Sequence, residues 1–195
     1  MHQPAADGGE LLRRARTGDG RAFEDLARDV EAGLYRHVVR IVGTAQEAED
    51  VVQDALLSAW RSMASFQGGS FRAWVFRIAT NRSIDVIRQR RRRGELPLEP
   101  PEGDEVEWAE PVAPGPDPAE LASQAEALTA VEEALQGVPA EQRAALLLRD
   151  VEGFSYEEIA QITAVEVGTV KSRIHRARTA VRNVLVQRGW RGSGG

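Results

Sequence analysis

The chain contains no cysteine among its 195 residues, which excludes disulfides and every metal site built on cysteine thiolates. It also contains no apolar run of membrane-spanning length, and its start, MHQPAADGGE, lacks the pattern of a secretory signal peptide. We therefore expect a cytoplasmic protein with no membrane insertion. A hydrophobic fraction of 42% is enough to fill one ordinary core or two small ones.

Basic residues are missing from one long internal stretch. Between residues 95 and 142 there is no Lys or Arg, whereas 13 of the 30 acidic residues lie there. The remainder holds 25 basic and 17 acidic residues, so the formal net charge of −5 conceals two cationic ends, together +8, joined by an anionic middle. Cationic ends favour a nucleic-acid partner, although the net charge alone argues against one.

Signs of catalytic chemistry are also missing. The sequence has no nucleophile–base pair and no phosphate-binding loop, and its three histidines, His2, His37 and His175, are scattered. We therefore expect no catalytic residue, no metal and no cofactor. The chain is predicted to act by binding and not as an enzyme.

The stretch 154–178 has the pattern of a helix-turn-helix. Ser155 and Glu158 have the spacing of a capping box, which predicts a short helix over 156–162. An apolar ladder at steps of three and four residues then predicts a second helix from about Val167. Its outward face carries polar side chains: Lys171, Ser172, His175, Arg176 and Thr179. Such a face is typical of a helix that reads the major groove, and a solvated face on a core helix is the alternative.

Further helical patterns fill the N-terminal half. Residues 21–42 carry an inward apolar stripe in which Gly33 predicts a bend or a division into two helices. Thr44 and Glu47 form a second capping-box pattern, ahead of a helix that runs to residue 63. The outward face of that helix carries four residues at spacings of three and four: Asp50, Gln53, Asp54 and Leu57. A leucine beside carboxylates suggests a docking surface, and an ordinary solvated face is the alternative.

Residues 71–93, which follow a glycine loop at 66–70, combine aromatic and cationic side chains. They include eight arginines and the single acid Asp85. Bases stack on rings and phosphates meet arginines, so this pattern is typical of a segment that binds single-stranded or partly opened nucleic acid. Trp74 and Phe76 fit a core better than a base platform, and the helix dipole alone also favours the arginine run at the helix end.

Seven prolines among acidic residues indicate an extended linker at 94–118. Helical patterns resume at 119–136 and lead through one more helix to the helix-turn-helix. The expected fold is therefore all-α, with two small helical domains, 10–93 and 119–188, joined by the acidic linker. At about 3.1 Å per residue this linker spans roughly 75 Å, close to two turns of duplex DNA at roughly 35 Å each.

Four motifs, in this order, resemble a bacterial sigma factor of the extracytoplasmic-function group (group IV) of the sigma-70 family. They are AEDVVQDALLSAW (48–60), FRAWVFRIATNRSIDVIR (71–88), LLLRDVEGFSYEEIA (146–160) and VGTVKSRIHRAR (167–178). The resemblance implies an alternative sigma factor that directs core RNA polymerase to specific promoters, recognises their −10 and −35 elements and helps to melt the −10 region. Its implied partners are the β′ and β subunits of core polymerase, promoter DNA and an anti-sigma factor.

The resemblance also implies roles for individual residues. The core-polymerase surface, similar to region 2.2, comprises Asp50, Gln53, Asp54 and Leu57. The −10 surface, similar to regions 2.3 and 2.4, comprises Phe66, Phe71, Arg77, Asn81, Arg82 and Arg88. The −35 surface, similar to region 4.2, comprises Lys171, Ser172, Arg173, His175 and Arg176. Glu166 departs from the group, in which proline or serine is usual at the start of the reading helix.

Two other functions fit parts of the sequence. A sigma mimic that binds only an anti-sigma factor has no need of the cations at 88–93 and 171–178. A conventional helix-turn-helix repressor leaves the outward face at Asp50 and Gln53, and the long linker, unexplained. The sigma factor accounts for all three features.

Overall fold

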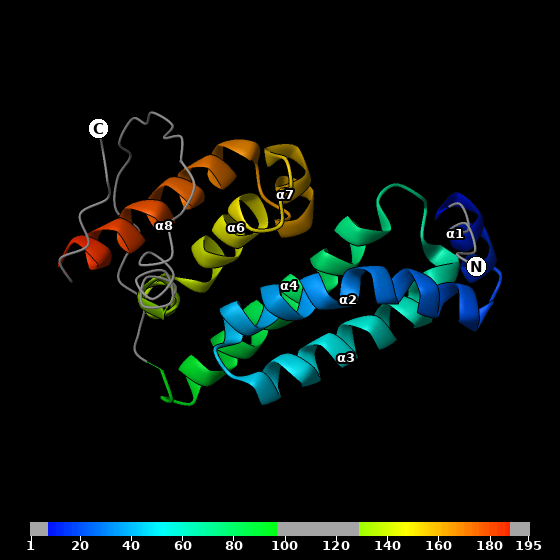
Figure 1. Ribbon diagram of the computed structural model, residues 1–195, viewed down its shortest axis with the longest axis horizontal. Helices are drawn as coiled ribbons and strands as arrows, with labels where there is room; N and C mark the ends of the chain where they lie inside the picture. Colours follow the sequence, from blue (N-terminus) through cyan, green and yellow to red (C-terminus); the bar gives the residue numbers. More distant parts are fainter. Residues whose placement is uncertain (1–7, 97–128, 188–195) are drawn as a thin grey trace, which may run out of the picture.

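The computed structural model describes residues 8–96 and 129–187, and every regular element in these ranges is helical (Figure 1). The N-terminal unit comprises α1 (Gly8–Arg16), α2 (Gly20–Val42), α3 (Ala45–Ser62), the 3-10 turn η1 (Met63–Ser65) and α4 (Phe71–Arg92). The C-terminal unit comprises helical residues 129–136, α6 (Ala140–Asp150), α7 (Tyr156–Thr163) and α8 (Val167–Gln187). The expected all-α fold is confirmed. The predicted linker beyond residue 96 and the predicted helix before residue 129 lie outside the described residues.

Local caps start the three long helices of the N-terminal unit. The caps are Asp19, Thr44 and Ser70, whose side-chain oxygens accept hydrogen bonds from backbone N–H groups of the first turn. α2 ends at Gly43, whose φ of 91° is left-handed and suits a residue without a Cβ atom. α2, α3 and α4 pack on one another, and α1 lies at one end of α2 (Figure 1).

α2 is one continuous helix, so Gly33 does not divide it into two helices. The reason for the glycine lies in tertiary packing. A Cβ atom at Gly33 would lie 3.3 Å from Glu152 Oε2 and 3.7 Å from Phe76 Cζ. A glycine inside a helix costs about 1 kcal/mol relative to alanine, and the surrounding packing is enough to keep α2 regular in spite of it.

In the C-terminal unit, the start of α7 matches the pattern expected from the sequence. Ser155 Oγ accepts a hydrogen bond from the N–H of Glu158 at 3.2 Å, and Glu158 Oε2 accepts one from the N–H of Ser155 at 2.8 Å. This is the predicted capping box, and it starts α7 at the predicted residue. Six buried aliphatic side chains of α6, α7 and α8 form the centre of the unit: Leu147, Leu148, Ile159, Ile162, Val170 and Ile174.

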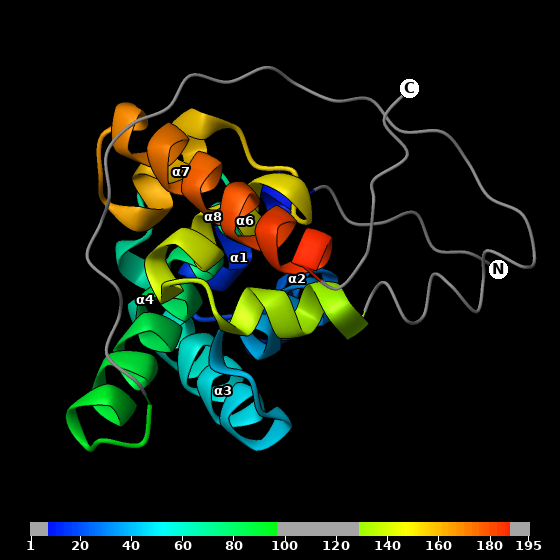
Figure 2. The same cartoon turned by 90° about the vertical axis from the view of Figure 1, so that its left-hand side faces the viewer.

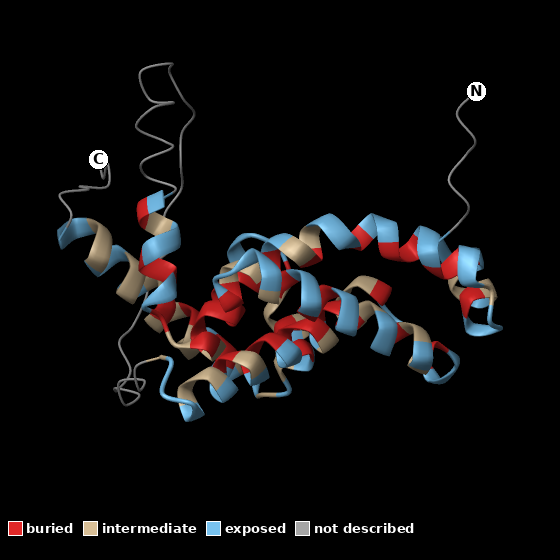
Figure 3. Cartoon of the chain, turned by 90° about the horizontal axis from the view of Figure 1, so that it is seen from below, coloured by how far each residue is buried: buried red, intermediate tan, exposed pale blue. Residues whose placement is uncertain are grey.

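The two units pack against each other, a point that the sequence leaves open. α7 lies against α4, and α6 lies against α2 (Figures 1 and 2). Their buried side chains form one continuous cluster, in which the rings of Phe76 and Phe154 meet edge to face at a centroid distance of 5.2 Å. The buried residues, red in Figure 3, follow the faces along which the helices meet.

Across the two described ranges, no helix combines the length and the hydropathy that a bilayer crossing requires. The same ranges contain no group of three or more His, Asp or Glu side chains placed to hold a metal ion.

Candidate functional site

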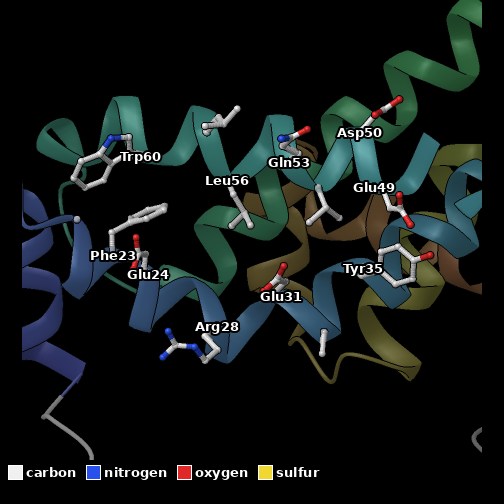
Figure 4. A pocket seen from close by; sticks show the side chains of 14 residues that line it. Phe23, Glu24, Arg28, Glu31, Tyr35, Glu49, Asp50, Gln53, Leu56 and Trp60 are labelled. Carbon is white, nitrogen blue, oxygen red and sulfur yellow. The ribbon is translucent and has the colours of Figure 1, made fainter. Parts of the chain in front are cut away.

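An open groove of about 1030 Å³ runs between α2 and α3 (Figure 4). Its apolar lining includes Phe23, Val52, Leu56 and Trp60. Its acidic lining comprises Glu24 and Glu31 from α2 with Glu49 and Asp50 from α3. Arg28, which also lines the groove, is paired with Asp25 at 2.8 Å. The groove therefore offers an apolar floor with a largely anionic rim.

The structure brings three of the four predicted docking residues into this groove, namely Asp50, Gln53 and Leu57. Leu57 is 43% exposed, so an apolar side chain is accessible at this surface beside the carboxylate of Asp50. Asp54 is not among the lining residues. Its carboxylate accepts a hydrogen bond from Arg82 at 2.7 Å and so ties α3 to α4, joining two residues that were predicted for different surfaces.

The α2 side of the groove was missed by the sequence reasoning. Glu24, Glu31 and Tyr35 lie off the inward stripe of α2, at steps of seven and four residues, so a helical signal was present. What the sequence does not show is which outward face of α2 lies beside α3. That pairing depends on tertiary packing.

The aromatic residues at the two ends of the glycine loop are buried. Phe66 and Phe71 are 6% and 7% exposed. The Phe66 ring packs on Trp74 at a centroid distance of 4.7 Å, and the Phe71 ring meets Phe23 edge to face at 5.9 Å. In this conformation the two rings anchor the loop to the core, and residues 67–70 between them are exposed.

A second hollow, of about 640 Å³, lies beside the glycine loop. Its lining includes backbone and side chains of the loop, Trp74 and Arg77 of α4, and Glu158 and Gln161 of α7. An indole, a guanidinium and several hydrogen-bonding groups thus meet in one cavity. Such a combination suits a planar polar ligand.

Four predicted residues lie exposed along α4: Arg77, Asn81, Arg82 and Arg88. Arg88 donates to Glu141 of α6 at 2.8 Å, so the C-terminal unit reaches this helix. Arg90, the first residue of the arginine run, has a structural role. Its Nη1 atom donates to the backbone oxygen of Val42 and to Glu47, both at 3.0 Å, and it thereby fixes the end of α2.

The turn of the helix-turn-helix comprises residues 164–166. α7 ends at Thr163 and is capped by Ala164, whose φ of 54° is left-handed and whose N–H donates to the backbone oxygen of Ala160. α8 begins at Val167, as predicted. The backbone oxygen of Glu166 accepts the N–H of Val170 at 3.1 Å, which closes the first turn of α8.

The inward residues of α8 are those predicted, with Val170, Ile174 and Ala177 buried. Lys171, the only lysine in the chain, is exposed, and its Nζ atom lies 5.7 Å from the centroid of the Tyr156 ring. The other four predicted residues are partly exposed: Ser172, Arg173, His175 and Arg176. The predicted set therefore lies on one helix, with Lys171 exposed and with Arg173 Nε and His175 Nδ1 buried at the edge of the packed face.

Two family models match the chain in the order of its two units. The model described as Sigma-70 region 2 matches residues 26–93, and the model described as Sigma-70, region 4 matches residues 128–181. The first range contains α3, α4 and most of the residues that line the groove. The second contains α6, α7 and most of α8.

Curated relatives match along most of the chain. The RNA polymerase sigma-H factor of Pseudomonas aeruginosa is 38% identical over 180 residues, which are 90% of this chain and 92% of the relative. The ECF RNA polymerase sigma-E factor of Escherichia coli is 35% identical over 175 residues, 89% of this chain and 91% of the relative. The ECF RNA polymerase sigma factor SigE of Mycolicibacterium smegmatis is 36% identical over 176 residues, 88% of this chain and 65% of the relative.

Two solved structures have the same fold. CnrH in complex with the cytosolic domain of CnrY gives a TM-score of 0.66 at 26% identity, over 91% of this chain and 96% of that one. RpoE in complex with the anti-sigma factor NepR, from Bartonella quintana, gives 0.63 at 30% identity, over 84% and 96%. The chain therefore belongs to the extracytoplasmic-function sigma factors of the sigma-70 family, which direct core RNA polymerase to promoters.

Proposed function

We propose that the groove between α2 and α3 is the surface that binds core RNA polymerase. The observation that carries this proposal is that Asp50, Gln53 and the exposed Leu57 share one groove with acidic residues of α2 (Figure 4). An apolar floor with an anionic rim fits an amphipathic helix that presents apolar side chains and cations. The β′ subunit is the expected partner, and Asp54 contributes from the edge of this surface.

The proposal assigns the −10 element to the glycine loop and α4. The hollow of about 640 Å³ has room for an unpaired base, with Trp74 as a stacking surface and Arg77 as a cation. Asn81, Arg82 and Arg88 continue this surface along α4, while Phe66 and Phe71 shape the loop. Holding unpaired bases in preference to paired ones shifts the melting equilibrium toward open DNA.

The proposal assigns the −35 element to α8. The five predicted residues all lie on a helix whose N-terminal end follows the turn at 164–166, and each is exposed or partly exposed: Lys171, Ser172, Arg173, His175 and Arg176. Cations and hydrogen-bond donors on such a helix suit the phosphates and base edges of the major groove. Glu166 precedes the first helical residue. A carboxylate at this place interacts favourably with the helix dipole but repels phosphate.

In this scheme residues 10–93 form region 2, residues 94–118 the linker and residues 119–188 region 4. The chain acts in the cytoplasm by binding, without a catalytic step of its own and without a cofactor. The β subunit of core polymerase is a further expected partner. An anti-sigma factor is the expected regulator, because RpoE of Bartonella quintana, a solved relative, is held in complex with one.

The double variant Asp50→Arg/Gln53→Ala tests the docking surface. It places a cation on the acidic rim and removes a polar side chain from the same groove, so we expect the variant to lose binding to purified core polymerase in a pull-down assay. Asp29→Arg is the matched control, because Asp29 is exposed on α2 and does not line the groove. Retention of core binding by the double variant would show that the docking surface lies elsewhere.

A further inference from the structure

The glycine loop lies at one end of the N-terminal unit, where the ends of four helices meet (Figure 1). Aromatic rings hold these helix ends together. The centroid of the Phe23 ring, near the start of α2, lies 5.2 Å from that of Trp60 in the last turn of α3 and 5.9 Å from that of Phe71 at the start of α4. α1 packs on α2 and on η1, the turn that leads into the loop. Residues from these helix ends are therefore neighbours of the loop.

This end of the N-terminal unit is cationic. Residues 8–23 and 58–70 contain five arginines against two acids. Both acids are paired, at 2.6 Å in each case: Glu10 with Arg13, and Asp19 with Arg14. The two ion pairs neutralise the acids, so the charge of the remaining arginines is not compensated locally.

The three remaining arginines, Arg16, Arg21 and Arg61, are all exposed. Within residues 8–96 and 129–187, none of the three pairs with a carboxylate. Arg16 and Arg61 stand in the last turns of α1 and α3, where the helix dipole favours a cation. Arg21 stands at the start of α2, where the dipole disfavours a cation and the first turn contains no acid. Helix stability therefore does not explain Arg21.

The polymerase groove does not explain these arginines either. The groove reaches the same end of the unit, with Gly20 and Trp60 in its lining, but its rim is largely anionic. A partner that presents cations to that rim is repelled by guanidinium groups beside it. The three arginines call for an anionic partner, and the neighbouring glycine loop is proposed to hold one, a single strand of DNA.

We propose that Arg16, Arg21 and Arg61 form a phosphate-binding surface for the strand whose bases the glycine loop and α4 hold. The backbone of that strand continues from the loop over the end of the N-terminal unit, and the three guanidinium groups pair with its phosphates. The contact adds affinity without sequence preference, because every nucleotide carries the same phosphate. The inference rests on the proposed function, since the strand reaches this surface only if the loop holds its bases.

The salt dependence of single-stranded DNA binding tests this surface. The full chain in complex with core polymerase is titrated with a fluorescent pool of random 20-nucleotide strands, and core polymerase alone gives the background. On single strands each phosphate contact contributes about 0.7 to the slope of log Kd against log salt concentration. Arg16→Gln/Arg21→Gln is therefore expected to lower the slope by about 1.4, and adding Arg61→Gln by about 0.7 more.

The expected difference is large enough to measure. Between about 50 and 200 mM salt, a slope difference of about 1.4 means that the unchanged chain loses about sevenfold more affinity than the double variant. Arg36→Gln/Arg182→Gln is the matched control, because it removes the same charge at exposed positions of α2 and α8 that lie away from the glycine loop. An equal fall in slope in the control overturns the inference, because the effect is then due to net charge alone.

Strand length tests whether the surface continues from the loop. Shortening the random pool to 8 nucleotides removes the part of the strand that extends beyond the loop. The double variant Arg16→Gln/Arg21→Gln is therefore expected to weaken binding of the 20-nucleotide pool more than that of the 8-nucleotide pool. Equal losses with both pools overturn the continuous path.

The same variants should keep their fold and their binding to core polymerase. Glutamine is close to arginine in helix propensity, and Arg21→Gln removes a cation from a helix N-terminus, so urea unfolding should show no loss of stability. Loss of core binding in a pull-down assay would assign these arginines to the polymerase surface and overturn the inference.

Failure of the inference and failure of the proposed function give different results. If the complex with the unchanged chain binds the 20-nucleotide pool no better than core polymerase alone, the assignment of the −10 surface fails, and the inference fails with it. If that complex binds better than core polymerase alone, and the double variant Arg16→Gln/Arg21→Gln has an unchanged slope, only the phosphate-binding surface is overturned.

Discussion

His37 is a buried titratable residue whose polar and charged neighbours come from α2 and α4. It lies in α2 at 1% exposure, and its Nε2 atom is 2.9 Å from the hydroxyl oxygen of Thr80. Burial, reinforced by the positive charges of Arg72 and Arg40, lowers the pKa of His37 from 6.5 to about 3. The imidazole is therefore neutral in the folded protein at neutral pH.

This shift predicts a loss of stability in mild acid. Below pH 6.5 the unfolded chain binds a proton at His37 that the folded chain does not bind, so the free energy of unfolding falls as the pH falls toward 3. Between pH 7 and pH 5 the expected contribution of His37 is about 2 kcal/mol. Urea unfolding at the two pH values measures it in the unchanged chain and in His37→Gln, whose amide can still meet Thr80.

The variant should lose about 2 kcal/mol less than the unchanged chain over this interval. Other titrating groups are present in both proteins, so the difference isolates the histidine. Equal losses in the two proteins would mean that His37 takes up its proton in the folded state as readily as in the unfolded state.

At the residue scale, sequence patterns identify types of side chain better than their partners. The aromatic residues Trp74 and Phe76 were predicted as core, and Phe76 is fully buried. The arginines of 71–93 were predicted to meet nucleic-acid backbone, yet Arg72 and Arg90 bind protein groups in this structure. An arginine carries the same charge whether it faces a phosphate or a carboxylate, and a single sequence does not distinguish the two.

The helices themselves are the most predictable elements, because their start signals are local. The capping box of Ser155 and Glu158 fixes the start of α7, and backbone and side-chain hydrogen bonds from Ser155 lower the pKa of Glu158. The expected division of α2 at Gly33 is wrong for the opposite reason, because it depends on a contact that is not local. Whether a glycine interrupts a helix depends on what packs against it. Here the packing partner is Glu152, which is distant from Gly33 in the sequence.

Ser155→Ala tests the contribution of this cap. It removes the acceptor for the N–H of Glu158, so we expect a loss of about 1 kcal/mol in the free energy of unfolding. Ser58→Ala is the control, because Ser58 is exposed within α3 and alanine is a good helix former. A loss in Ser155→Ala no larger than in the control would show that α7 does not depend on its cap.

The docking groove cannot be predicted in full from single helices taken one at a time. Periodicity along one helix placed Asp50, Gln53, Asp54 and Leu57 on one face. Three of them line the groove, whereas Asp54 pairs with Arg82. The residues of α2 that complete the groove carry the same helical signal. Their contribution follows only from the way in which α2 and α3 pack side by side (Figure 4).

For the whole molecule, ion pairs between opposite charges join the two units, although the two ends of the chain are cationic overall. On the cationic helix α4, Arg72 pairs with Glu152 and Arg88 pairs with Glu141, both of the C-terminal unit. The exposed pair is weakened by salt, whereas the nearly buried carboxylate of Glu152 is screened much less. The sequence established the overall charge of each segment but not this contact, because a few side chains without any periodic pattern carry it.

Run-off transcription with purified core polymerase on a promoter library tests the central claim most directly. If the groove binds the polymerase, α4 the −10 element and α8 the −35 element, the protein should give transcripts that depend on particular promoter sequences, and core polymerase alone should not. Transcripts with no dependence on promoter sequence, or no transcripts at all while the protein still binds core polymerase, would contradict the account.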